Sequence, residues 1–129
     1  RSRRLCRVSS TSFDTGLHPA DLDPKRPRAV ETPWGMLALY TVDGAVLAAQ
    51  AFCPHLEGPL FEGTLHADEI VCPWHQWRYS LRTGRRVGIG ALLSAGGEPL
   101  LLADVALSAR GTFVLSNARR GERPVEPSR

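Results

Sequence analysis

The sequence predicts an all-β fold in a single antiparallel domain, and three observations support this. Helix-forming runs are scarce in the 129 residues, whereas twelve glycines and ten prolines supply frequent turns. Asp43-Gly44 stands between two apolar runs, a pattern typical of a tight β-hairpin. The composition, 43% hydrophobic and 22% charged, is that of an ordinary globular protein. This length suffices for one domain with a modest core.

The expected elements follow in order along the chain. Residues 3–9 form a candidate first strand, and residues 9–28 form a loop with one helical turn near Pro19–Leu22. A hairpin is predicted at 36–42 and 45–52, and its second strand runs directly into Cys53. The other strands are predicted at 30–32, 61–65, 69–72, 78–81, 100–109 and 112–116.

Residues of the metal-ligating types stand in two matched pairs, Cys53-Pro54-His55 and Cys72-Pro73-Trp74-His75. Each pair can place its Cys and His on one tight loop, and sixteen residues separate His55 from Cys72. That spacer is long enough for a hairpin that brings the two loops face to face. Two thiolates and two imidazoles suit a tetrahedral zinc site or an iron–sulfur centre. Structural zinc sites more often use C-x-x-C and H-x3-5-H pairs, which favours the iron–sulfur centre.

Both loops resemble those of the Rieske iron–sulfur family. The first resembles the family pattern C-x-H-x-G-x-x-L, with one extra residue between His55 and Gly58. The second resembles C-P-x-H-x-x-x-[FY]-[DS]-x-x-[TS]-G. It is matched by Cys72, Pro73, His75, Tyr79, Ser80, Thr83 and Gly84. The resemblance covers about residues 50–90; outside that span only the pattern of short strands agrees.

The resemblance implies a Rieske-type [2Fe–2S] cluster and its fold. Cys53 and Cys72 would bind the inner iron, and His55 and His75 the outer iron. The fold would be an antiparallel β-sandwich base with a small cluster-binding subdomain at about 50–90. We expect one Rieske domain over residues 1–117 and a disordered tail over 118–129, which is rich in Arg, Glu, Pro, Gly and Ser.

Several positions depart from the family pattern. Many members carry Gly after the second His, where this chain has Gln76, so that residue is either strained or outside the left-handed region. Trp77 replaces a Ser that high-potential members use to bond a sulfide, whereas Tyr79 can still supply a hydroxyl donor to a Cys sulfur. Trp74 and Trp77 are candidates for an apolar shield around the cluster. The extra cysteine pair of the cytochrome bc subgroup is missing, so the chain resembles the ferredoxin and oxygenase-domain branch.

The resemblance implies a one-electron carrier, a Rieske ferredoxin, rather than an enzyme, and we nominate no catalytic residue. No second His/His/carboxylate set remains for a mononuclear iron once His55 and His75 are used. The expected partners are a flavin reductase and a terminal oxygenase or hydroxylase. Two alternatives stay open: a Rieske subunit of a larger oxidoreductase complex, and a zinc-stabilised binding module. Iron content separates the zinc module from the other two.

The composition also bears on the possible partners and on the cellular compartment. The net charge is +3, and no basic run is interleaved with aromatic residues, so a nucleic-acid partner is not expected. No stretch approaches eighteen apolar residues, so no membrane span is expected. Cys6 is left over from the two pairs and is interpreted as a buried strand residue. A disulfide framework is therefore not implied, which favours a reducing compartment, the cytoplasm. His18 and His66 are interpreted as surface residues.

Overall fold

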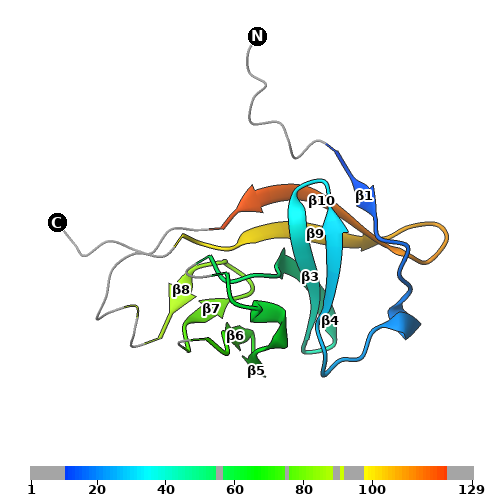
Figure 1. The fold of residues 1–129 in the computed structure, drawn as a ribbon. Coiled ribbons are helices and arrows are strands. Elements are labelled where there is room, and N and C mark those ends of the chain that lie inside the picture. Colours follow the sequence, from blue (N-terminus) through cyan, green and yellow to red (C-terminus); the bar gives the residue numbers. More distant parts are fainter. Residues whose placement is uncertain (1–10, 55–56, 75, 89–90, 92–97, 122–129) are drawn as a thin grey trace, which may run out of the picture.

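The computed structural model describes residues 11–54, 57–74, 76–88, 91 and 98–121, which form two antiparallel sheets. The six-stranded sheet is the base of the molecule, and a four-stranded sheet lies against one of its faces (Figure 1). In the base sheet the spatial order is β1 (Phe13–Asp14), β10 (Phe113–Arg120), β9 (Leu101–Leu107), β4 (Ala45–Gln50), β3 (Gly35–Val42) and β2 (Arg28–Thr32). The small sheet has the order β5 (Thr64–His66), β6 (Glu69–Val71), β7 (Arg78–Ser80) and β8 (Arg86–Val87). The predicted all-β fold, with a base and a small second sheet, is confirmed.

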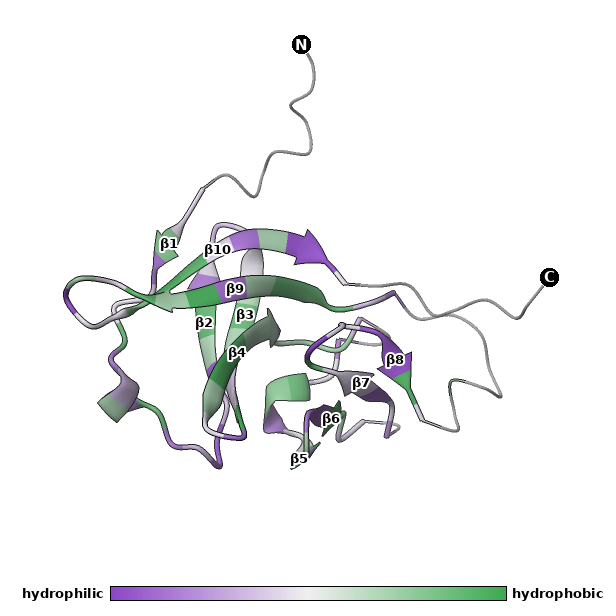
Figure 2. Ribbon diagram, turned by 180° about the vertical axis from the view of Figure 1, so that it is seen from behind, coloured by the Kyte–Doolittle hydropathy of each residue, from purple (hydrophilic) through white to green (hydrophobic). Residues whose placement is uncertain are grey.

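The β3–β4 hairpin forms the centre of the base sheet, as predicted. Asp43 and Gly44 have φ of 52° and 81°, both positive, as a two-residue type I′ turn requires. Strand β3 is apolar on both faces because both are covered. Its residues Ala38, Tyr40 and Val42 join the core shared with the small sheet, whereas Leu37 and Leu39 join a second core on the opposite face. Figure 2 shows this green, apolar centre in β3 and β4.

The small sheet is joined to the base through buried residues from both. Ile70 and Tyr79 lie opposite one another on β6 and β7, and both are fully buried in the shared core. The 3₁₀ helix η3 (Leu60–Glu62) adds Leu60 to that core, which is why β5 begins at Thr64 rather than at Phe61. Backbone bonds from Leu100 N–H to the Gly84 carbonyl (2.8 Å) and from Phe61 N–H to the Ala51 carbonyl (3.1 Å) connect the layers further.

Some predicted boundaries were wrong. Strand β4 ends at Gln50, and a bend at Ala51–Phe52 precedes Cys53, so the strand does not run directly into the first loop. Strand β10 continues to Arg120, beyond the predicted end at Ser116 and into the predicted tail. A bulge at Asn117, whose φ is 54°, shifts the register and lets the strand resume pairing with β9. The strands β1 and β8, of two residues each, are too short to show a sequence period.

Of the remaining predictions, some are confirmed by the structure and others concern residues that it does not describe. The helical turn near Pro19 is the 3₁₀ helix η2 (Pro19–Asp21), and His66 is exposed. The predicted strand at 3–9, with Cys6, and tail residues 122–129 lie outside the described residues. Within the described residues, the helical segments are all too short and too polar for a membrane crossing.

Candidate metal centre

The two cysteine loops share one backbone design. The Cys53 N–H donates to the carbonyl of Gly58, five residues later, at 2.7 Å. The Cys72 N–H donates to the carbonyl of Trp77, also five residues later and also at 2.7 Å. In each loop the fourth residue after Cys has a positive φ, 62° at Glu57 and 60° at Gln76. The two loops therefore share the same closing hydrogen bond and the same positive-φ position.

This correspondence corrects the alignment of the first loop. Glu57, rather than Gly58, occupies the left-handed position equivalent to Gln76, because each stands four residues after its Cys. With no extra residue, Leu60 also falls on the leucine of the family pattern. The apparent insertion is instead a substitution at the glycine position. Both loops thus hold a non-glycine residue where a Cβ is disfavoured, and Gln76 takes the strained of the two predicted alternatives.

The two thiols lie together at the contact between the loops. Cys53 and Cys72 are each 1% exposed and belong to the same buried cluster, and the Cys53 thiol contributes to the raised pKa of Cys72. Gly58 permits this approach, because a Cβ there would lie 3.1 Å from the Cys72 sulfur and 2.8 Å from Cδ2 of Trp74. A side chain at position 58 would therefore collide with the indole of Trp74 and press on the Cys72 sulfur.

Electrostatics in this pocket favour a protonated Cys72 thiol in the metal-free protein. Burial raises the pKa of the Cys72 thiol to about 11; the backbone N–H of Trp74 opposes the rise, and the Cys53 thiol adds to it. A coordinating thiol is deprotonated by its metal, so metal binding here releases protons. Two buried sulfurs side by side, with a backbone N–H directed at one of them, fit one iron of an iron–sulfur cluster.

Two buried tyrosines surround the thiol pair. The Tyr79 hydroxyl lies 3.5 Å from the Cys53 sulfur, and burial followed by this contact raises the pKa of Tyr79. The predicted hydroxyl contact to a Cys sulfur is confirmed. Tyr40 comes from β3 and donates to the Gln50 carbonyl at 2.9 Å, and burial raises its pKa as well. Both hydroxyls therefore remain protonated, and that of Tyr79 is the one placed to donate to a sulfur.

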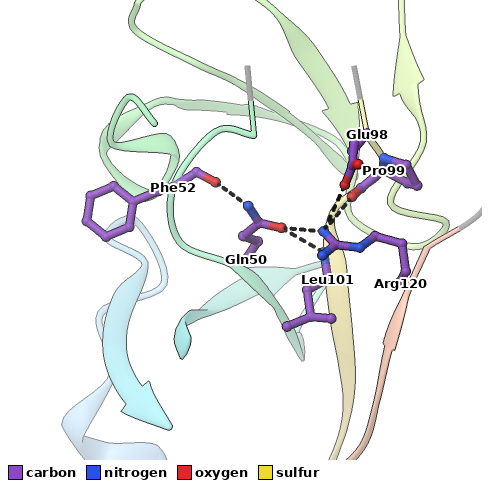
Figure 3. A network of polar contacts seen from close by, with 6 residues as sticks. All are labelled: Gln50, Phe52, Glu98, Pro99, Leu101 and Arg120. Carbon is purple, nitrogen blue, oxygen red and sulfur yellow. Dashed lines mark hydrogen bonds and ion pairs between the residues drawn. The ribbon is translucent and has the colours of Figure 1, made fainter. Parts of the chain in front are cut away.

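A polar network anchors the segment that leads into the first loop (Figure 3). The Gln50 amide nitrogen donates to the Phe52 carbonyl at 2.9 Å. Its amide oxygen accepts from the Leu101 N–H at 3.0 Å and from Arg120 Nη1 at 3.2 Å. The same Arg120 nitrogen donates to the Pro99 carbonyl at 3.1 Å and lies 4.0 Å from Glu98. One glutamine thus connects the ends of β4, β9 and β10 just before Cys53.

The structure describes the two predicted cysteine ligands but not the two predicted histidine ligands. Cys53 and Cys72 are brought together, whereas His55 and His75 lie outside the described residues. Trp74 is 49% exposed, with its indole close to Gly58. Trp77 is partly buried against the shared core. Cluster shielding by these two indoles stays a prediction.

The comparisons with known proteins decide the family. A family model described as Rieske [2Fe-2S] domain matches residues 15–95. The chain belongs to the Rieske [2Fe-2S] domain family. Such a domain implies a Rieske-type cluster, in which two Cys hold one iron and two His hold the other. The Rieske fold of the two sheets is supported by solved structures as well.

Among solved structures, one chain of the complex of reduced oxygenase and oxidized ferredoxin in carbazole 1,9a-dioxygenase aligns with a TM-score of 0.69 and 26% identity. The alignment covers 86% of this chain and 97% of that one. The Sphingomonas yanoikuyae B1 ferredoxin aligns with a TM-score of 0.69, 22% identity and coverage of 82% and 98%, which supports the fold alone.

Curated relatives match over shorter segments. The ferredoxin component of the naphthalene 1,2-dioxygenase system of Pseudomonas aeruginosa is 43% identical over 49 residues, which are 38% of this chain and 47% of that protein. Apoptosis-inducing factor 3 of Mus musculus is 36% identical over 70 residues, 54% of this chain and 12% of that protein. The chain thus spans half or less of the length of these curated relatives.

Sequence reasoning missed three contributors to the centre. Gln50 carried no signal, because a polar residue at a strand end looks like a solvent-facing one. Glu57 could have been recognised by aligning the two loops on their cysteines instead of on Gly58. Arg86 lies on β8, directly opposite Tyr79, and a strand of two residues gives too little alternation to reveal that pairing.

Proposed function

We propose that this chain is a Rieske ferredoxin, a carrier that accepts one electron from a reductase and passes it to a terminal oxygenase or hydroxylase. The chemistry requires a metal centre that changes charge by one while the protein hardly moves, and a rigid, buried site meets that requirement. The two matched loops, packed on the shared core and closed by short backbone bonds, supply that rigidity. The buried thiol pair between them is the observation that carries the proposal.

The proposed ligands are Cys53 and Cys72 for one iron, and His55 and His75 for the other. The similar closure of the two loops supports this assignment, because each His stands between its Cys and the positive-φ residue of its loop, His55 two residues after Cys53 and His75 three after Cys72. When bound, the cluster supplies reversible one-electron chemistry at a potential above that of all-Cys plant-type ferredoxins. The chain's own residues hold the thiols, exclude water from them and direct Tyr79 at one sulfur.

The relatives indicate the class of partner. Ferredoxin components of naphthalene 1,2-dioxygenase and p-cumate 2,3-dioxygenase systems, at 43% and 42% identity over their matched segments, work in systems with oxygenases. By analogy, we propose a flavin reductase as donor and an oxygenase or hydroxylase as acceptor. The proposed location is the cytoplasm, since cysteine ligands are kept reduced there.

The test is metal analysis and spectroscopy of protein purified without oxygen. We expect about two irons and two labile sulfides per chain, a red-brown colour and reversible one-electron reduction. Cys53→Ser and Cys72→Ser should lose the cluster, whereas Ser108→Ala in the distant β9–β10 turn should keep it. Stoichiometric zinc without iron or sulfide would instead identify a structural zinc module.

A second candidate is a Rieske component that works only inside a larger oxidoreductase. Similarity to segments of larger proteins favours it, since this chain matches only 12% of apoptosis-inducing factor 3 and 34% of a dicamba monooxygenase chain. Size-exclusion analysis of the native protein from its source cells distinguishes the two. A small, freely migrating holoprotein supports the ferredoxin, and a stable complex with a large catalytic subunit supports the component.

A further inference from the structure

Arg86 is a basic residue that the fold buries beside the metal centre. It is only 5% exposed, although it occupies a strand at the edge of the small sheet. Its guanidinium carbon lies 3.3 Å from the centroid of the Trp77 ring, a stacked cation–π contact. Burial protects the charge of this guanidinium from solvent, and the contact with Trp77 fixes its position.

Two connections lead from Arg86 to the sulfurs. Trp77, on which the guanidinium stacks, closes the second loop by accepting the Cys72 N–H at 2.7 Å. Tyr79, the cross-strand partner of Arg86, places its hydroxyl 3.5 Å from the Cys53 sulfur. Arg86 is therefore placed next to groups that contact both loops.

We propose that Arg86 is a potential-setting residue, whose buried positive charge, held on the face of Trp77, favours the reduced state of the centre. This inference rests on the proposed function, because it presupposes a cluster between the loops. One electron enters, no bond forms or breaks, and the charge of the site falls by one. A fixed cation nearby stabilises that added negative charge, and low exposure keeps water and salt from screening it.

A neighbouring arginine provides the contrast. Arg78 lies on β7, but its side chain is 40% exposed and pairs with Glu69 at 3.3 Å. A solvated, paired charge is largely screened, so its removal should change the potential little. Arg110, exposed in the β9–β10 turn at the opposite end of the molecule from the small sheet, is the matched control for net charge (Figure 1).

The experiment is voltammetry of the holoprotein and of four variants, each first characterised by iron content and visible spectrum. Arg86→Met and Arg86→Gln remove the charge, Arg86→Lys keeps it, and Arg110→Met changes net charge alone. We expect Arg86→Met and Arg86→Gln to reduce the equilibrium constant for reduction about tenfold, which is about 59 mV for one electron. Arg86→Lys and Arg110→Met should stay within about twofold of the parent.

The dependence of the potential on ionic strength distinguishes the effect of a buried charge from that of a surface charge. The difference between the parent and Arg86→Met should persist from low to high ionic strength, because a buried charge is poorly screened. Three results would overturn the proposal: an unchanged potential in a loaded Arg86→Met or Arg86→Gln, a tenfold change in loaded Arg86→Lys, or a difference that disappears in salt. If the neutral variants do not load, a tenfold change in the reduction equilibrium of loaded Arg86→Lys still overturns the proposal. Absence of iron in the parent itself would refute the proposed function instead.

Discussion

At the scale of single residues, hydrogen bonding to the sulfurs sets how readily the centre accepts an electron. Tyr79 directs its hydroxyl at the Cys53 sulfur from 3.5 Å, inside the shared core. The sulfur becomes a better acceptor when the site gains negative charge, so this bond strengthens on reduction. The indole of Trp77, which stands where high-potential members use Ser, cannot make the same short contact. With the Tyr79 hydroxyl but no serine hydroxyl at position 77, we expect a potential in the lower half of the Rieske range.

The first prediction concerns Tyr79→Phe, which removes only the hydroxyl. Bonds to charged groups are worth about 1.5–3 kcal/mol, and about 1.4 kcal/mol corresponds to about 59 mV for one electron. The potential depends only on how much stronger this hydrogen bond is in the reduced state than in the oxidised state. We therefore expect the potential of Tyr79→Phe to fall by several tens of mV, with about 130 mV as the upper limit. Protein-film voltammetry of the parent and of Tyr79→Phe measures this difference in reduction potential.

Tyr40→Phe is the control for Tyr79→Phe, because the Tyr40 hydroxyl donates to the Gln50 carbonyl rather than to sulfur. It should lower the free energy of unfolding by about 1 kcal/mol and leave the potential nearly unchanged. Equal potentials for Tyr79→Phe and the parent would show that the Tyr79 hydroxyl does not influence the centre.

The second prediction concerns the strained loop positions. Glu57 and Gln76 have φ near 60°, where a Cβ costs about 1–2 kcal/mol. Glycine removes that strain but loses more entropy on folding, about 0.5–1 kcal/mol. Glu57→Gly should therefore raise the free energy of unfolding by up to about 1 kcal/mol. Chemical denaturation of the metal-free protein measures the change.

Glu31→Gly makes the matched comparison, because Glu31 is an exposed glutamate in the regular strand β2. There the same substitution should destabilise by about 0.5–1 kcal/mol. Loss of stability in both variants, to the same extent, would show that the first loop carries no strain at Glu57.

At the scale of elements, the hydrogen bonds at the end of β4 hold the start of the first cysteine loop in place. Gln50 makes three bonds there, to Phe52, Leu101 and Arg120 (Figure 3). Two of its partners are backbone groups, the Phe52 carbonyl and the Leu101 N–H, and each loses a hydrogen bond if the amide is removed. The third prediction is that Gln50→Ala lowers the free energy of unfolding by about 1–3 kcal/mol and increases the rate at which the cluster is lost.

Arg119→Met provides the comparison for Gln50→Ala. Arg119 bonds Asp104 at 2.9 Å on the open surface of β9 and β10, with 43% of its side chain exposed. An exposed pair of this kind contributes at most about 1 kcal/mol. We therefore expect a small loss of stability and an unchanged rate of cluster loss. A similar rate for Gln50→Ala and Arg119→Met would contradict a supporting role for Gln50.

The strongly patterned elements are those that the sequence predicted well. Asp43-Gly44 between apolar runs, and the two cysteines that the fold brings together, each reflect a local constraint that the sequence records directly. The end of β4, the bulge at Asn117 and the strand β8 depend on partners distant in sequence, such as Leu101 for Gln50. Arg86 was missed for the same reason, because its neighbours Trp77 and Tyr79 are set by strand pairing.

At the scale of the whole molecule, the two sheets divide the work. The base sheet buries a core on each face and carries the β9–β10 turn at one end, while the small sheet and the cysteine loops lie at the other end (Figure 1). Glu57, Pro73, Trp74 and Gln76 are exposed parts of those loops. This arrangement favours electron exchange through the loop end, which these exposed residues form.

The last prediction tests that face through charge. Glu57→Lys and Arg78→Glu change the charge beside the loops in opposite senses, so they should change the association rate with a given redox partner in opposite directions, by about threefold to tenfold at low salt. The effects should diminish at high ionic strength because exposed charges are screened. Arg110→Glu makes the same charge change as Arg78→Glu at the far end and should leave the rate nearly unchanged. Stopped-flow measurement of electron transfer over a range of salt concentrations gives the rates. If Arg110→Glu changes the rate as much as Arg78→Glu does, net charge rather than the loop end guides the encounter. If neither Glu57→Lys nor Arg78→Glu changes the rate at low salt, the partner docks on another face.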